Sequence, residues 1–444
     1  MKNCLMNNKI YSSEALQEFI LSLETQYNIE NAQEKYHNLV NFSANAAVPF
    51  HQWFIYREGF AGELIASLIA MSGVQKDEVV IDPFCGSGTT NVVAAMNGYK
   101  TLGLDVNPMS AFISNAKIKH YEKRIIDLAR FHVSFLRSHK TVSKKPYYSD
   151  VERYFSAANY HDLLVIKSYI DSLPNSKVRD LMFVAYLSII IDCSDRKRDG
   201  NGLKVRPSKV TDAYDCYEKK IDTILKDLTA TKPCSAGKSA CVYESANNLY
   251  SVFQSIFKGF QAGAIIFSPP YPNSFDYFES YKLELVMGDF AKGLKGLNEF
   301  RQKAVRSFVG AESQSKCDEY VDLIAKEIES AIPIKEQRTG KKDARTRKVP
   351  NMIRGYFSDM HEVIRQCSSC LSAGKKVFIV VDQSAYVGKI VPTDLLLAYY
   401  GEQEGFTVGR IIKCRNARTS TQQLNEFPFL KTSLRESIVE LIKR

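Results

Sequence analysis

The sequence lacks any hydrophobic run long enough to cross a membrane. Its longest apolar stretch, residues 181–191, falls well short of the ~20 residues that a spanning helix needs, and we expect it to form a buried helix. The N-terminus also lacks the apolar core and small-residue cleavage site of a secretory signal. These absences predict a cytoplasmic protein that has no membrane partner and keeps its cysteines reduced.

The sequence is also poor in metal-binding patterns. Its ten cysteines are scattered, and although Cys367 and Cys370 have a spacing typical of metal ligands, no second pair accompanies them. A structural zinc site needs four ligands, so we expect no metal. Charge is in modest excess, with 59 Lys and Arg against 49 Asp and Glu and a formal net charge of +10. This excess suits a polyanionic partner, but it is also typical of a solvated basic face.

From Val79 onward, short β-branched runs alternate with helical stretches. Compact apolar runs occur at residues 79–81, 101–106, 264–267, 376–381 and 437–442. This alternation predicts an α/β fold with a mostly parallel sheet and crossover helices.

Residues 82–90, Asp-Pro-Phe-Cys-Gly-Ser-Gly-Thr-Thr, lie between the first expected strand and its helix. Gly86 and Gly88 let the backbone turn tightly and let a ligand lie against it without a Cβ clash. Asp82 can accept a hydrogen bond from a cationic amino group, and Asp105 ends the next strand, where a carboxylate can bind ribose hydroxyls. The loop matches neither a Walker sequence nor a full dinucleotide fingerprint, so it indicates another nucleoside ligand.

Ser268-Pro-Pro-Tyr271 follows an apolar strand and should lie at the carboxyl edge of the sheet, where α/β proteins bind ligands. The lone pair of an aromatic amine is delocalised into its ring, and acceptors on its two N–H bonds favour a tetrahedral, nucleophilic nitrogen. Ser268 Oγ and the Pro269 carbonyl can be these acceptors, and Pro269 and Pro270 restrict φ and hold that carbonyl. Tyr271 offers a face on which a base can stack. Taken alone, the tetrapeptide would also suit a simple turn after a strand.

Together the two motifs resemble those of the amino-group DNA methyltransferases. Residues 82–90 are similar to the cofactor motif of that family, residues 103–108 to its ribose-binding segment, and Ser268–Tyr271 to its catalytic tetrapeptide. The resemblance implies S-adenosyl-L-methionine as the cofactor and direct methyl transfer to a base that has been flipped out of the duplex. The residues that it assigns to the cofactor are Phe60, Asp82, Pro83, Phe84, Gly86, Gly88, Thr89, Asp105, Glu244 and Ser245.

The resemblance also implies a domain organisation. A seven-strand, Rossmann-like methyltransferase core with a mixed, mostly parallel sheet is expected over residues 46–118 and 241–444, after a helical segment over 1–45. Residues 119–240 are expected to form a helical insert and candidate target-recognition region, and 291–355 a basic insert within the core. In a common arrangement of the family the recognition insert follows the adenine-contacting segment, whereas here it precedes that segment, so the location of target recognition stays open.

Two cation-rich segments are candidates for DNA contact. Residues 196–204 have the composition of a flexible basic loop, which would present Arg196, Lys197, Arg198 and Lys204 to a groove or backbone. The run 335–348 would place Lys341, Lys342 and Arg345 on phosphates. A solvated basic loop explains the second segment equally well.

The first residue of the tetrapeptide bears on the target base. Within the family that the motifs resemble, Ser is typical of cytosine-N4 enzymes and Asp or Asn of adenine-N6 enzymes. We therefore expect methylation of cytosine N4 in double-stranded DNA, with adenine N6 as the alternative. An RNA base-amine methyltransferase and a catalytically silent DNA-recognition subunit are more distant alternatives. The resemblance also suggests a restriction-modification setting with a cognate endonuclease as partner, while the oligomeric state cannot be read from the sequence.

Overall fold

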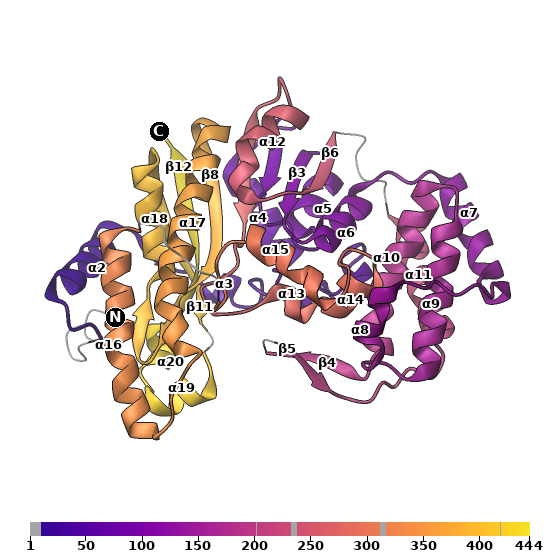
Figure 1. Cartoon of the computed structure of the whole chain (residues 1–444). Coiled ribbons are helices and arrows are strands. Elements are labelled where there is room, and N and C mark those ends of the chain that lie inside the picture. The colour runs from indigo at the N-terminus through magenta and orange to yellow at the C-terminus, as the bar shows by residue number, and fades with distance from the viewer. Residues whose placement is uncertain (1–9, 201, 232–237, 311–316, 418) are drawn as a thin grey trace.

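The structure is a computed structural model that describes residues 10–200, 202–231, 238–310, 317–417 and 419–444. Its centre is an eight-stranded sheet in the order β1-β11-β12-β8-β7-β2-β3-β6 (Figure 1). The strands are β1 (Ile29–Asn31), β2 (Val79–Asp82), β3 (Lys100–Asp105), β6 (Ser239–Tyr243), β7 (Ala262–Phe267), β8 (Leu371–Asp382), β11 (Phe406–Asn416) and β12 (Arg435–Lys443). β12 is antiparallel to both of its neighbours, and the other pairs are parallel. This mixed, mostly parallel sheet is the expected Rossmann-like methyltransferase core.

The eighth strand corrects our expectation for the N-terminal segment. Helix α2 (Glu14–Gln26) begins at Ser13, whose side chain accepts the N–H of Leu16. Beyond it, however, β1 adds to the sheet edge in parallel with β11. The described part of residues 1–45 is therefore not purely helical, because a three-residue strand there completes an edge that the sequence pattern did not reveal.

Alternate residues of the central strands face two helical layers. Val79 and Ile81 pack with one layer, and Val80 packs with the other. β2 and β7 are buried along their whole length, as expected of central parallel strands covered on both faces. The helices of the core are α3 (Gln33–Tyr36), α4 (Gly62–Ser72), α5 (Thr89–Met96), α6 (Pro108–Ile118), α12 (Leu249–Ile256), α17 (Val349–Cys370) and α18 (Thr393–Gln403).

The order of the strands creates a switch point between β2 and β7. From β2 the chain moves outward through β3 and β6, and it then returns to place β7 and β8 on the other side of β2. Connections that leave in opposite directions open a crevice at the carboxyl ends of two adjacent strands, which is where such folds bind ligands. Residues 82–90, the expected cofactor loop, follow β2, and the tetrapeptide follows β7, so both motifs lie at this crevice.

Between α6 and β6 the described residues form mainly helices, which pack beside the core where the helical insert was expected (Figure 1). Its elements are α7 (Lys123–Phe135), α8 (Ser149–Glu152), α9 (Ala157–Ser172), α10 (Ser176–Cys193), α11 (Ala213–Ala230) and the hairpin of β4 (Arg196–Asp199) and β5 (Gly202–Val205). The apolar run 181–191 lies in α10 and is largely buried, as predicted. No helix among the described residues is long and apolar enough to span a bilayer.

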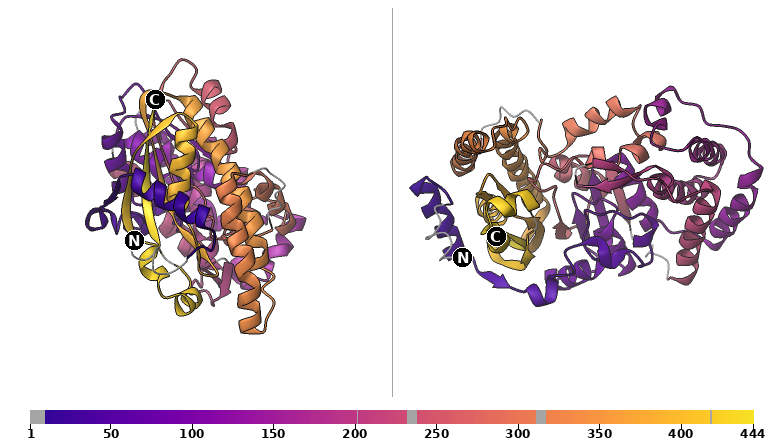
Figure 2. Two further views of the ribbon diagram at one scale, coloured as in Figure 1. Left: turned by 90° about the vertical axis from the view of Figure 1, so that its left-hand side faces the viewer. Right: turned by 90° about the horizontal axis from the view of Figure 1, so that it is seen from below.

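The described residues of 291–355, expected as a basic insert within the core, are mainly helical. After α13 (Tyr277–Ser280), α14 (Lys282–Met287) and α15 (Leu297–Lys303), the chain forms α16 (Glu319–Thr339), which packs against α17. Apolar residues of α16 such as Ile324 and Ile328 belong to the same core as the sheet. The remaining α-helices and strands are β9 (Ser384–Tyr386), β10 (Lys389–Val391), α19 (Thr421–Glu426) and α20 (Leu430–Ser433). Seen from below, the α16–α17 pair and the insert stand at opposite ends of the molecule (Figure 2).

Candidate active site

The glycine turn after β2 is held by one face of helix α6. Gly86 and Gly88 have φ values of +49° and +87°, in the left-handed region that favours glycine. Ser114 Oγ donates to the Gly86 carbonyl at 2.7 Å, and Lys117 Nζ donates to the Ser87 carbonyl at 2.9 Å. A Cβ on Gly88 would lie 2.8 Å from Ser114 Oγ. Helix packing therefore requires Gly88, and the turn is fixed before any ligand binds.

Asp105 is fixed by the backbone of the two neighbouring loops. Its Oδ2 accepts the N–H of Gly86 at 2.8 Å, and its Oδ1 accepts the N–H of Asn107 at 2.7 Å. Burial raises the pKa of Asp105 to about 6, although these two bonds favour the charged form. A carboxylate has about four acceptor positions, so acceptor capacity remains for the hydroxyl groups of a ligand.

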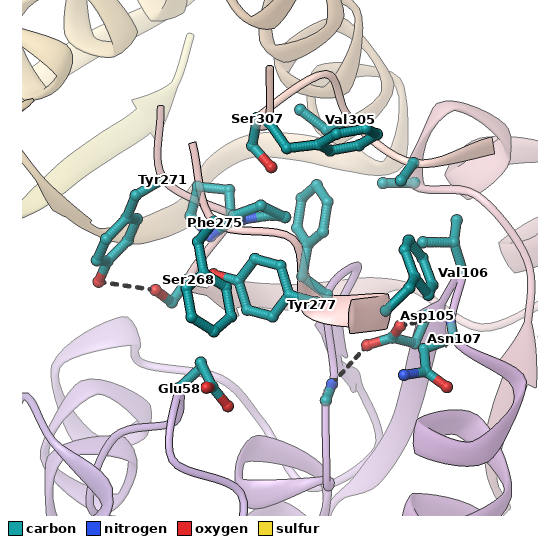
Figure 3. Close-up of a pocket in the computed structure, with 18 of the residues that line it drawn as sticks. Glu58, Asp105, Val106, Asn107, Ser268, Tyr271, Phe275, Tyr277, Val305 and Ser307 are labelled. Atoms are coloured by element: carbon teal, nitrogen blue, oxygen red, sulfur yellow. Dashed lines mark hydrogen bonds between the residues drawn. The ribbon is translucent and has the colours of Figure 1, made fainter. Parts of the chain in front are cut away.

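The two motifs border one cavity of about 330 Å³ (Figure 3). Pro83, Phe84 and Gly86 of the cofactor loop line it, as do all four residues of the tetrapeptide, Ser268–Tyr271. The other lining residues are Tyr56, Glu58, Asp105, Val106, Asn107, Ser245, Ala246, Asn273, Phe275, Tyr277, Phe278, Lys303, Ala304, Val305, Ser307, Phe308 and Asp382. Figure 3 shows Asp105 at one end of this space and Tyr271 at the other. The structure thus brings together two motifs that are far apart in the sequence.

The tetrapeptide is closed by an internal hydrogen bond. Ser268 Oγ donates to the Tyr271 hydroxyl at 3.1 Å (Figure 3). Downstream, the Tyr386 hydroxyl donates to the Pro272 carbonyl at 2.9 Å, and Arg345 Nη2 donates to the Ser274 carbonyl at 3.1 Å. Ser274 has a φ of +64°, a strained value for a residue with a Cβ. The loop after β7 is therefore held in shape from the side of β9 and the α16–α17 connection.

Comparison with known proteins agrees with this arrangement. A model of the N6 and N4 methyltransferases, described as DNA methylase, matches residues 11–116. The type II methyltransferase M.BsoBI of Geobacillus stearothermophilus is 27% identical over 94% of this chain and 91% of its own length. The type II methyltransferase M.AvaI of Nostoc sp. is 25% identical over 87% of this chain and 85% of its own. These matches support its place in the amino-group DNA methyltransferase family.

Among solved structures, the rRNA methyltransferase aviRa from Streptomyces viridochromogenes aligns over 86% of this methyltransferase and 85% of its own chain, with 9% identity and a TM-score of 0.27. The fold of this methyltransferase is defined by its own strand order, given above.

Five of the expected cofactor residues lie outside the cavity wall. Asp82 is 1% exposed, accepts the N–H of Phe84 at 3.0 Å, and has its pKa raised to about 7 by burial. Phe60 packs in the layer that contains α4, and Thr89 is buried at the start of α5. Gly88 lies against Ser114, as described above. Glu244 lies next to Ser245, whose N–H its carboxylate accepts at 2.8 Å, and only Ser245 lines the cavity.

Glu58 and Asn107 are two of the polar residues of the wall that were not predicted from the sequence. Glu58 accepts the Tyr281 hydroxyl at 2.7 Å, and Tyr281 stacks on Tyr56 with ring centroids 5.1 Å apart. Burial raises the pKa of Glu58. Asn107 Nδ2 is buried and has no hydrogen-bond partner among the described residues. Its place two residues after Asp105 was a signal for Asn107, whereas no motif marks Glu58.

The described residues of the first cation-rich segment form two strands, where the sequence had predicted a flexible loop. Residues 196–199 and 202–205 pair as an antiparallel hairpin with Gly200 in the left-handed region. Arg198 forms an ion pair with Glu284, and its guanidinium lies 4.2 Å from the centroid of the Tyr281 ring. Because its side chain is only 9% exposed, Arg198 anchors the hairpin beside the active site and is not presented to DNA.

The second segment, 335–348, comprises the last turn of α16 and its connection to α17, and it is largely paired within the protein. Lys335 contacts Asp343 at 2.7 Å, and Arg347 and Arg338 pair with Glu336 and Glu426. The side chain of Arg345 supports the Ser274 carbonyl rather than extending freely into solvent. Lys341 and Lys342 are exposed, and their contact with phosphates stays a prediction.

Proposed function

We propose that this methyltransferase transfers a methyl group from S-adenosyl-L-methionine to N4 of a cytosine flipped out of double-stranded DNA. The observation that carries the proposal is the single cavity bordered by both the cofactor loop and Ser268–Tyr271. Ser in the first position of the tetrapeptide favours cytosine over adenine. Two relatives named as type II methyltransferases support a restriction-modification setting, with a cognate endonuclease as the expected partner.

The walls of the cavity suit the cofactor chemically. Asp105 offers a fixed carboxylate for the ribose hydroxyls, and Asn107 Nδ2 is a buried donor that lacks a partner among the described residues. Val106 and Phe278 provide apolar surface for the adenine, beside Ser245. When bound, the cofactor supplies an electrophilic methyl group on a sulfonium sulfur.

For the cationic amino group of the cofactor's methionine part, we propose Glu58 rather than Asp82. Asp82 is sealed beneath the loop, whereas Glu58 lines the cavity. Gly86 packs so closely against Tyr56 that a Cβ on Gly86 would lie 3.0 Å from the Tyr56 ring. Because Tyr56 lies two residues before Glu58, the glycine turn and Glu58 line neighbouring parts of the cavity wall. A charge-assisted hydrogen bond to an ammonium group is about twice as strong as a neutral one.

The tetrapeptide is suited to orient the target amine. The Ser268 hydroxyl donates a hydrogen bond to the Tyr271 hydroxyl, so the lone pairs of its oxygen stay available to accept an N–H of the amine. The Pro269 carbonyl is the second acceptor. Phe275 and Tyr277 line the same part of the cavity and provide aromatic faces on which a flipped base can stack, which is worth about 1–3 kcal/mol per base.

Mass spectrometry of nucleosides tests the choice of base. DNA from cells that express the chain is digested and compared with DNA from cells that express the Ser268→Ala variant. N4-methylcytosine that depends on Ser268 is the expected result. N6-methyladenine in its place would overturn the choice of cytosine, and the absence of both marks, with a methylated base in RNA, would overturn DNA as the substrate.

A further inference from the structure

A second cavity, of about 450 Å³, lies between the β4–β5 hairpin, the end of α10 and residues 54–57. Its cationic lining includes Arg57, Arg196, Lys197, Arg206, Lys209 and Lys220, in addition to the anchored Arg198. We call this cavity the cationic notch. Within the part of the chain that the structure describes, two carboxylates, Asp192 and Glu284, line it.

The charges of the notch are largely uncompensated. Glu284 is already neutralised by Arg198. Among the described residues, Arg57, Arg196, Lys197, Arg206 and Lys209 have no carboxylate within ion-pair distance. Concentrated positive charge of this kind raises the local concentration of anions, and arginine side chains match the geometry of phosphate oxygens. The notch therefore suits a phosphate-bearing ligand.

The notch and the catalytic cavity lie back to back. Arg57 lines the notch, and the next residue, Glu58, lines the catalytic cavity. Arg57 Nη1 donates to the Arg198 carbonyl at 2.8 Å, which ties the hairpin to this shared wall. In Figure 1 the hairpin hangs below α13 and α14, on the side to which the carboxyl ends of the parallel strands point. A strand whose base enters the catalytic cavity would therefore have neighbouring phosphates within reach of the notch.

We infer that the cationic notch binds backbone phosphates of the DNA strand beside the flipped base. This inference rests on the proposed function, because it takes DNA as the polyanion. Flipping a base costs a few kcal/mol of stacking and pairing, and phosphate contacts on the flanking backbone help to offset that cost while they fix the register of the strand. The contacts are independent of sequence, so the notch contributes affinity rather than choice of site.

The test compares two double variants with equal changes of charge. In Arg206→Ala/Lys209→Ala two exposed cations of the notch are removed. In the control, Lys123→Ala/Lys226→Ala, two exposed cations are removed from α7 and α11, where they pair with Asp127 and Asp222. Binding of a DNA duplex is measured across a range of salt concentrations, together with affinity for the cofactor.

For the notch variant we expect roughly tenfold weaker binding to cognate and non-cognate duplexes alike. The slope of log Kd against log salt should fall by about 0.9 for each phosphate that the variant no longer neutralises. KM for DNA should rise with little change in kcat, and cofactor affinity should match the wild type, which shows that the variant is folded. The control should keep the wild-type slope.

Three results would overturn the inference. One is an unchanged slope and affinity in the notch variant while the wild type methylates DNA, which leaves the proposed function intact. Another is an equal loss in both double variants, which would show a general effect of charge. A third is binding of RNA, but not of DNA, that depends on Arg206 and Lys209, and this result would overturn the proposed function as well.

Discussion

The catalytic cavity and the cationic notch share a wall but are built on different principles. In the cavity, backbone groups and neighbouring side chains hold the polar residues in place before a ligand arrives, as Gly86 and Asn107 hold Asp105 and as Tyr271 engages Ser268. Such preorganisation suits chemistry, because a reacting group displaced by about 1 Å can cost roughly 100-fold in rate.

In the notch the cations are partly exposed and have few acidic neighbours. Arg206 and Lys209 carry charge to the surface without a fixed partner among the described residues. This arrangement suits a polyanion whose phosphates are held by charge and whose sequence is not read there. The difference predicts that substitutions in the two places have separate effects. Those in the cavity should alter turnover or cofactor binding, and those in the notch should alter the salt dependence of DNA binding.

The largest expected effect comes from Tyr271. Tyr271→Ala removes both the aromatic face and the hydroxyl that accepts the hydrogen bond of Ser268, so we expect kcat to fall by about 100-fold or more. Cofactor affinity and the salt slope of DNA binding should stay near the wild type. Single-turnover methyl transfer, cofactor titration and DNA binding measure the three quantities.

Tyr271→Phe is the matched control for this prediction. It keeps the ring and removes only the hydroxyl, so we expect a smaller loss, about tenfold, from misorientation of Ser268. Wild-type turnover in Tyr271→Ala would show that Tyr271 neither stacks on the base nor orients Ser268.

A smaller effect is expected at Glu58, which lines the catalytic cavity next to Arg57 of the notch. Glu58→Gln removes a charge facing the cavity, and cofactor affinity should fall by roughly 10- to 100-fold, as for loss of a charge-assisted hydrogen bond. Burial raises the pKa of Glu58, so wild-type affinity should strengthen as pH rises through that pKa and the carboxylate ionises. Glu58→Gln should lose this pH dependence.

Asp82→Asn is the comparison for Glu58, because its carboxylate is buried beneath the loop and bonded to the N–H of Phe84. We expect it to change cofactor affinity by less than Glu58→Gln. Calorimetric titration from pH 5 to pH 8 would measure both variants. The reverse order of effects would return the amino group of the cofactor to Asp82.

The sequence predicted the part of the site that depends on backbone geometry. Gly86 and the prolines of the tetrapeptide can be recognised in the sequence because few residues tolerate such turns. The alternation of strands and helices predicted that both loops would meet at one sheet edge. Glu58 and Tyr56 could not be found in the same way. They lie in the short irregular stretch before α4 and enter the cavity only through the fold.

The number of charges in a segment was a weaker guide to the DNA-contacting residues than the motifs were to the active site. Residues 196–204 and 335–348 look alike in sequence, yet Arg198 is buried against Glu284 and Lys335 is paired with Asp343. The notch is lined by Arg196 and Lys197 of the first segment, but also by Arg57 and Arg206, which lie outside both segments. A cation remains available to a ligand only where the fold brings no carboxylate close to it. Which carboxylate pairs with which cation cannot be read from the sequence, because some partners are distant in sequence and others are one of several acidic residues nearby.

The smallest expected effect is at Lys335, and it sharpens the contrast between paired and unpaired cations. Lys335→Ala breaks a partly exposed ion pair with Asp343, so it should cost about 0.2–1 kcal/mol of stability, seen as a small drop in the thermal midpoint. Because the charge of Lys335 is already compensated, the salt slope of DNA binding should not change. The matched variant Lys341→Ala/Lys342→Ala removes exposed cations from the same connection. A lower slope in that variant would show that the α16–α17 connection also contacts phosphates, and a lower slope in Lys335→Ala would mean that pairing within the protein does not withhold a cation from DNA.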